Sequence, residues 1–137
     1  MTDTTKQARP PEGGRVELAI TFLYFRDLPR AQRFYEDALG LHLAIDQGWS
    51  KIYRLAGAAH LGLVDETRGA HRAADPKPVQ VCLRVPEVDA WHDWLSRLGA
   101  ADLTAPRDVK ALGIRAFTLS DPEGHQIEIQ SATRHGA

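Results

Sequence analysis

The sequence predicts an α+β domain of two β-α-β-β-β modules that form a partly open barrel around a central cavity. Runs rich in β-branched and aromatic residues occur in both halves of the 137-residue chain, as in strands. Each half also has one stretch with apolar residues at helical spacing. This stretch ends at Gly40 in the first half and at Gly99 in the second. The order of these elements repeats, because Ile20 aligns with Gln80 and Gly40 with Gly99 at offsets of 60 and 59 residues.

The first half begins with a predicted strand over residues 16–25. Asp27 can cap the helix that follows, and Pro29 suits its first turn. The apolar face of this helix comprises Leu28, Ala31, Phe34, Tyr35, Ala38 and Leu39. Three further strands are predicted over residues 41–45, 50–55 and 59–64, with a turn at Gly48.

The second half follows the same order, with a strand over residues 79–85 and a helix that opens at Pro86. A short strand is predicted at residues 102–104, and two longer strands at 114–119 and 125–130. The last two are joined by Asp121-Pro122-Glu123-Gly124, in which proline presets φ and glycine tolerates the exit geometry of a turn. The apolar face of the helix comprises Val88, Trp91, Trp94, Leu95 and Leu98.

The domain organisation follows from these elements. Residues 1–14 are predicted to be a flexible polar tail, and residues 15–131 a single domain. Module 1 spans about residues 15–65, a linker with prolines and a glycine spans 66–78, and module 2 spans about 79–131. One module cannot bury both faces of its sheet, so we expect the two sheets to pair, with helices on their outer faces.

The composition excludes several classes of partner. The formal net charge of -1 and the absence of a basic stripe give no support for nucleic-acid binding. No apolar run reaches the ~20 residues that a membrane helix needs. Cys82 is the single cysteine, which rules out an intrachain disulfide and favours a reducing compartment. We therefore expect a cytoplasmic protein without nucleic-acid or membrane partners.

Two segments carry a family resemblance: F-R-D-L-P-R-A-Q-R-F-Y-E-D-A-L-G-L at residues 25–41 and S-D-P-E-G-H-Q-I-E-I at residues 120–129. Together they resemble the vicinal oxygen chelate superfamily of glyoxalases, bleomycin resistance proteins and extradiol dioxygenases. The resemblance implies a glyoxalase-like fold, a small-molecule ligand and a homodimer, with or without exchange of halves between chains. Because this fold hosts many reactions as well as metal-free antibiotic binding, function has to be argued from the site.

Strand alternation assigns the residues that face the cavity. In the second half these are Gln80, Cys82 and Arg84 on one strand, and Gln126, Glu128 and Gln130 on another. In the first half the repeat assigns Ile20, Phe22 and Tyr24 to the cavity, together with His60 and Gly62.

The resemblance implies that metal-dependent members draw one ligand from each of four strands, at positions equivalent to Ile20, Gly62, Gln80 and Glu128. Only Gln80 and Glu128 have side chains that can coordinate a metal, and a divalent metal needs about three protein ligands. We therefore expect no metal cofactor. If a divalent metal does bind, His60 is the candidate third ligand beside Gln80 and Glu128.

Several cavity residues allow two interpretations. Glu128 is the candidate catalytic residue, with the role of a general base, and it is also a candidate partner for a cationic ligand. The structural alternative is that its carboxylate pairs with Arg84 or is exposed to solvent. Phe22 and Tyr24 stack on a planar ligand or belong to the core. Trp49 covers the cavity mouth or caps the sheet edge, and Cys82 is a nucleophile or an inert thiol.

The leading hypothesis is a small-molecule-binding protein of the bleomycin-resistance type, with a degenerate metal site. Its ligand-binding residues would be Ile20, Phe22, Tyr24, Trp49, Gly62, Gln80, Cys82, Arg84 and Glu128. Such a cavity suits a planar, partly cationic ligand. The alternative is a glyoxalase-like lyase, isomerase or dioxygenase that uses Glu128, Gln80 and His60. A third hypothesis is an interaction module without a ligand.

Overall fold

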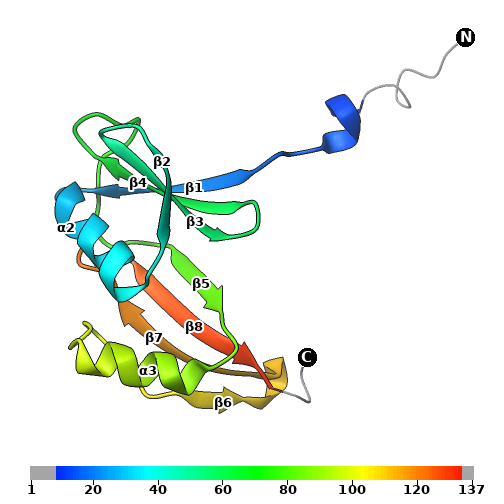
Figure 1. Ribbon diagram of the computed structural model, residues 1–137, viewed down its shortest axis with the longest axis vertical. Coiled ribbons are helices and arrows are strands. Elements are labelled where there is room, and N and C mark those ends of the chain that lie inside the picture. The colour runs from blue at the N-terminus through cyan, green and yellow to red at the C-terminus, as the bar shows by residue number, and fades with distance from the viewer. Residues whose placement is uncertain (1–8, 134–137) are drawn as a thin grey trace, which may run out of the picture.

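The computed structural model describes residues 9–133 and contains two four-stranded sheets, one from each half of the chain (Figure 1). Of the predicted tail, residues 1–8 lie outside the described residues, and Pro11–Gly14 form a 3-10 turn. The first half contains β1 (Ala19–Phe25), α2 (Leu28–Arg33), η2 (Phe34–Ala38), β2 (His42–Asp46), β3 (Ser50–Ala56) and β4 (Ala59–Asp65). The second half contains β5 (Gln80–Arg84), α3 (Val88–Arg97), β6 (Arg107–Val109), η3 (Lys110–Leu112), β7 (Ile114–Ser120) and β8 (Gln126–Ala132).

The two sheets have the same topology, which confirms the predicted repeat. Their strand orders are β1-β4-β3-β2 and β5-β8-β7-β6, with one parallel pair in each sheet. The register repeats as well, since Phe22 lies opposite Gly62 in the first sheet and Cys82 opposite Glu128 in the second. The barrel stays open, and Figure 1 shows the first sheet in the upper part of the molecule and the second below it.

The first helix is less regular than its sequence pattern predicts. Asp27 caps α2 by accepting a hydrogen bond from the Arg30 amide at 3.1 Å. After Arg33 the chain continues as the π-helical turn η2. Gly40 then takes a φ of +66°, a left-handed conformation that glycine adopts without steric cost, and the helical segment ends as predicted.

The core lies between each sheet and its helix, on the face opposite to the predicted cavity residues. Leu23 and Phe25 of β1 and Ile127 and Ile129 of β8 are buried there. Tyr35 of η2 and Leu95 of α3 are fully buried and belong to the same cluster. The burial pattern therefore agrees with the predicted strand faces.

The turn before β8 joins the two halves. Asp121 and His125 are buried, and the Tyr35 hydroxyl donates to the Asp121 carboxylate at 2.8 Å. The same carboxylate oxygen lies 2.7 Å from His125 Nδ1. Glu123 accepts hydrogen bonds from the backbone N–H groups of Arg26 and Asp27, each at 2.8 Å. We call this set of contacts the hairpin clasp.

Two predicted strand positions are wrong. The strand expected at residues 102–104 is absent, because Asp102 has a φ of 54° that breaks an extended chain. The edge strand β6 lies further on and begins at Arg107, after Pro106. The first strand also starts later than predicted, at Ala19, and leaves Val16 74% exposed.

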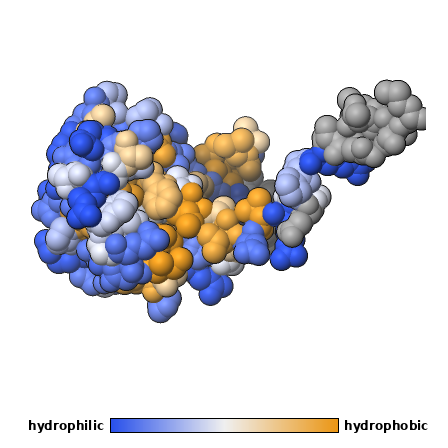
Figure 2. Space-filling model, turned by 90° about the horizontal axis from the view of Figure 1, so that it is seen from above, coloured by the Kyte–Doolittle hydropathy of each residue, from blue (hydrophilic) through white to orange (hydrophobic). Residues whose placement is uncertain are grey.

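Apolar side chains are exposed on the first half. Figure 2 shows them gathered in the middle of the upper face, beside the projecting N-terminal segment. The large exposed apolar residues of this half are Val16, Leu18, Phe22, Ile45 and Trp49. In the part of the chain that the structure describes, no helix has the length and apolar character needed to cross a membrane.

Candidate functional site

The open face of the second sheet carries a hollow of about 640 Å³. Its floor is the central strand β7, which presents the small residues Ala116 and Thr118. Longer side chains rise on both sides, from β8 and from β6. Because a strand with small residues lies between strands with long ones, this face forms a basin of the volume typical of ligand sites. The lining residues are Gln80, Thr104, Ala105, Arg107, Val109, Leu112, Ile114, Ala116, Phe117, Thr118, Glu128 and Gln130.

Side chains of β5 and β8 pair across the ladder on this face. Gln80 donates to Gln126 at 2.7 Å, and the Cys82 thiol lies 3.4 Å from Glu128 Oε2. Arg84 donates through two nitrogens to Gln130 Oε1, at 2.8 and 2.6 Å. The structure thus brings together the three predicted residues of β5 and the three of β8.

Glu128 is held by this network rather than by an arginine. Gln130 Nε2 donates to Glu128 Oε2 at 2.6 Å, and Arg84 fixes the amide orientation of Gln130. Arg84 therefore reaches Glu128 only through Gln130, and no ion pair joins the two within residues 9–133. Among described residues, nothing donates a hydrogen bond to Glu128 Oε1, so this oxygen is available at the hollow.

Cys82 shares this network as a protonated thiol. Burial, the hydrogen bond to Glu128 and the negative charge of Glu128 raise its pKa to about 11, while Arg84 acts in the opposite direction. A thiol is nucleophilic only as its thiolate. The environment of Cys82 thus favours the inert interpretation over the nucleophilic one.

Alkylation of the single cysteine is expected to be slow near neutral pH and to accelerate toward pH 11. Replacing Glu128 with Gln removes the neighbouring charge and should move the midpoint of the rate profile to lower pH. The rate of carbamidomethylation by iodoacetamide, followed by mass spectrometry, measures both effects. A midpoint near the ordinary thiol pKa of ~8.5 in the unaltered protein would contradict this expectation.

The first-half positions lie on the face of their own sheet and do not line this hollow. A Cβ built on Gly62 would collide with Cδ1 of Phe22 and lie 2.6 Å from its Cε1, so the Phe22 ring covers the position where a side chain of residue 62 would stand. The same Cβ would lie 3.4 Å from Cγ2 of Ile20. The Phe22 ring therefore packs on the Gly62 backbone with one side. Because Phe22 is 42% exposed, the ring also presents a surface to solvent.

The other first-half aromatic residues are placed differently. Tyr24 packs edge-on against His71 of the linker, with ring centroids 5.3 Å apart. Phe22 and Tyr24 line a separate hollow of about 260 Å³, bounded by the linker and by His125. Trp49 lies in the turn before β3, where the Arg68 guanidinium sits 5.8 Å from the ring centroid.

The residues at the four family metal positions do not fit a divalent metal. Ile20 has no donor atom, and the space beside Gly62 is taken by Phe22. The Gln80 amide is bonded to Gln126, and His60 Nδ1 lies 3.0 Å from its neighbour Ala58 O. Within residues 9–133, no three His, Cys, Asp or Glu side chains are grouped so as to hold a metal ion.

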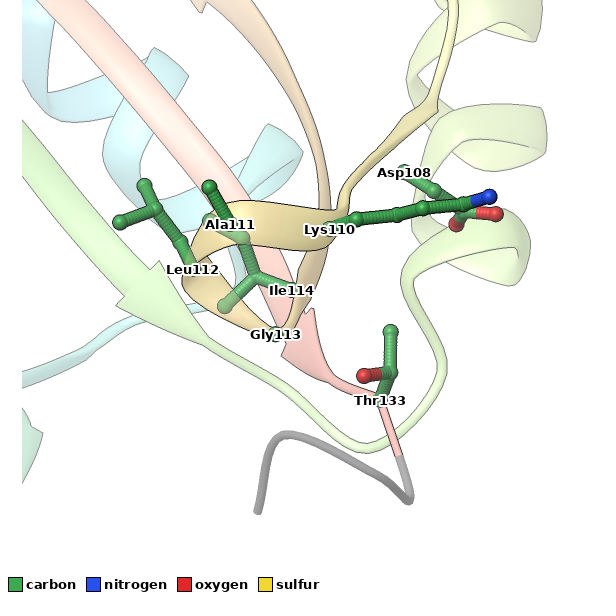
Figure 3. Close-up of a pocket in the computed structure, with 7 residues that line it drawn as sticks. All are labelled: Asp108, Lys110, Ala111, Leu112, Gly113, Ile114 and Thr133. Carbon is green, nitrogen blue, oxygen red and sulfur yellow. The ribbon is translucent and has the colours of Figure 1, made fainter.

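A hollow of about 710 Å³ lies at the end of the second sheet, around η3. Figure 3 shows that Leu112 and Lys110 point in opposite directions from this turn. Leu112 lines both this hollow and the hollow above the second sheet, so η3 forms a wall between them. Thr133, the last residue described, forms part of the lining.

The sequence interpretation missed Arg107 in the site. Arg107 lines the hollow from β6, the strand that was expected at residues 102–104. The available signal was Pro106, which is rare inside a strand and suits the residue before its start. Gln130 was assigned to the cavity face, but pattern alone could not show that it holds Glu128.

Comparisons with solved structures show the same fold. A glyoxalase/bleomycin resistance protein/dioxygenase from Nocardioides has a TM-score of 0.74 at 19% identity, over 97% of this chain and 92% of that one. A lactoylglutathione lyase from Agrobacterium tumefaciens has a TM-score of 0.68 at 22% identity, over 86% and 95%. The fosfomycin resistance protein FosX from Listeria monocytogenes has a TM-score of 0.69 at 14% identity, over 89% and 98%.

A search of curated proteins finds no match. The sequence profile described as Glyoxalase/Bleomycin resistance protein/Dioxygenase superfamily matches residues 17–129, which include both modules and the linker. With the repeated β-α-β-β-β topology, this match shows that the chain belongs to the glyoxalase/bleomycin resistance protein/dioxygenase superfamily.

Proposed function

We propose that this protein binds a planar, partly cationic small molecule without a catalytic metal, in the manner of a bleomycin-resistance protein. The observation that carries the proposal is Glu128. Its carboxylate stands at a hollow of about 640 Å³, held through one oxygen by Gln130 and Cys82 while the other oxygen remains available. A half-buried carboxylate of this kind gains most from a cation that meets it in the same hollow.

The first half carries an apolar surface outside this hollow, and we propose that the second copy of the homodimer described below brings that surface to it. The exposed ring of Phe22 offers a flat surface, and the absence of a side chain at Gly62 lets the ring lie close to the sheet. Flat aromatic surfaces stack on planar ligands and on cations. Gly62 stands at one of the four positions from which metal-dependent members draw a ligand, and the Phe22 ring fills the space beside it. We therefore derive no metal-dependent step.

Binding of proflavine, a planar cation, tests the proposal. We expect saturable binding by fluorescence anisotropy, weakened roughly tenfold or more by Glu128→Gln because a charge-assisted contact is lost. Glu17→Gln is the matched control, since Glu17 is exposed and lies outside the hollow. Equal affinity for the Glu128→Gln variant would refute the proposal. Stoichiometric nickel, zinc, iron or manganese in the purified protein would overturn the metal-free assignment.

We also propose that the protein forms a homodimer in which the second copy covers the open sheet faces. The support is the exposed apolar surface of the first half, where Val16, Leu18, Phe22 and Ile45 are 39–74% exposed. Contiguous apolar surface on a small protein marks an interaction site. Sedimentation velocity should report twice the 15.2 kDa chain mass, whereas a stable monomer at high concentration would count against the dimer. Cytoplasmic location remains part of this proposal.

A further inference from the structure

The hollow above the second sheet has two charged lining residues, and their charges are opposite. Glu128 stands on β8 and Arg107 on β6, with β7 between them. The remaining lining residues are uncharged. Among the residues that the structure describes, no ion pair joins Arg107 to Glu128, so both charges face the hollow independently.

Arg107 is the unengaged member of a group of charges at this edge. Its neighbour Asp108 pairs with Arg115 at 3.3 Å, and Arg115 also holds Asp89 at 3.1 Å. Side chains alternate along a strand, so Asp108 points away from the hollow that Arg107 lines. Within residues 9–133, Arg107 has neither a hydrogen bond nor an ion pair, and its planar fork of donors matches a carboxylate.

The register sets the distance that a ligand must span. Arg107 lies opposite Ala116, whereas Glu128 lies opposite Thr118, two residues further along β7. Strands are ~4.8 Å apart and residues two apart along a strand are separated by ~7 Å, so the backbone positions of Arg107 and Glu128 lie about 12 Å apart, diagonally across β7. Ala116 and Thr118 leave the space between the two charged side chains open.

We infer that the ligand of this hollow is a zwitterion, with a cationic group at Glu128, a carboxylate at Arg107 and a flat apolar spacer between them. The inference rests on the proposed function and specifies its ligand class. A ligand with only a cationic group would bring its charge into a hollow that also holds an unpaired guanidinium. A second, anionic group on the ligand removes that repulsion and satisfies Arg107.

Three para-substituted benzenes of matched shape serve as probes: 4-(aminomethyl)benzoate, the cation 4-methylbenzylamine and the anion 4-methylbenzoate. Dissociation constants come from amide chemical-shift titrations of the full chain, which also report whether each variant is folded. We expect the zwitterion to bind roughly tenfold or more tightly than either singly charged probe. Equal affinity for the zwitterion and 4-methylbenzylamine would overturn the inference, as would the absence of binding by all three.

Variants separate this inference from the proposed function. Arg107→Gln should weaken zwitterion binding roughly tenfold or more and leave 4-methylbenzylamine binding intact or improved. Arg97→Gln, on the exposed side of α3 and outside the hollow, is the matched control and should change neither affinity. If Arg107→Gln leaves zwitterion affinity unchanged while Glu128→Gln abolishes cation binding, the zwitterion is refuted and the proposed function stands. If Glu128→Gln affects no probe, both are refuted.

Discussion

Replacing Asp121 with Asn is expected to lower the free energy of unfolding by about 3 kcal/mol, because it breaks a buried charged network. The Asp121 carboxylate accepts hydrogen bonds from the Tyr35 hydroxyl and from the backbone N–H groups of Glu123 and His125, and lies 2.7 Å from His125 Nδ1. An amide of the same shape cannot accept all of these bonds. Urea denaturation followed by circular dichroism measures the loss.

The matched control is Asp93→Asn on the exposed face of α3, which should change the stability by less than ~0.5 kcal/mol. A loss that small at Asp121 would show that the hairpin clasp does not hold the halves together. Tyr35→Phe removes a single donor to Asp121 and should cost less than Asp121→Asn. This ordering distinguishes the role of the carboxylate from that of ring packing.

Asp121 also sets a pH dependence with a defined sign. Burial acts to raise its pKa, but the hydrogen bond and charge of His125 and the hydrogen bonds from Tyr35 and the backbone lower it overall. The native state therefore binds the proton more weakly than the unfolded state. The stabilisation is complete above the unfolded-state pKa of ~3.9 and is lost as the pH falls through the lower native value. Asp121→Asn should remove this part of the acid dependence.

Replacing Gly62 with Ala is expected to cost about 2 kcal/mol of stability, since the new methyl group collides with Phe22. The added Cβ would overlap Cδ1 of the ring and lie 2.6 Å from Cε1, so the ring has to leave the sheet. Gly62 is buried beneath this ring, and the displaced Phe22 could no longer present the same flat surface. Urea denaturation followed by circular dichroism measures the loss.

A double-mutant cycle identifies the cause of the Gly62→Ala effect. In a Phe22→Ala background the space above residue 62 is free, so the same substitution should be nearly neutral for stability. If Gly62→Ala costs the same in both backgrounds, the loss arises from the backbone and not from the collision.

Local patterns predicted the elements and the strand faces well, because both depend on short-range periodicity. Gly40 and Gly99 mark the ends of their helical segments, and alternation along β5 and β8 placed Gln80, Cys82 and Glu128 on one face. The turn at Asp121 was also predicted from its residue types. Its bonds to Tyr35 were not, since they join positions 86 residues apart.

The site depends on such long-range packing and was predicted only in part. Alternation showed that Phe22 and Gly62 share a face, but not that the ring covers the glycine. Arg107 was missed because a strand of three residues carries too little periodicity to be located after Asp102 and Pro106. The sequence also predicted one cavity lined by both halves, but the relative placement of the two sheets cannot be predicted from local patterns. Among the described residues, the hollow at Glu128 is lined by the second half alone.

The Glu123 contacts of the hairpin clasp have a consequence for how this sequence can diverge. Glu123 binds the main-chain N–H groups of residues 26 and 27 and makes no demand on their side chains through these bonds. Substitutions of the Arg26 side chain therefore leave these two hydrogen bonds intact. Loss of the Glu123 carboxylate removes both hydrogen bonds at once. At the Glu123 contacts the first half contributes only backbone, so natural variants should accumulate at Arg26 rather than at Glu123.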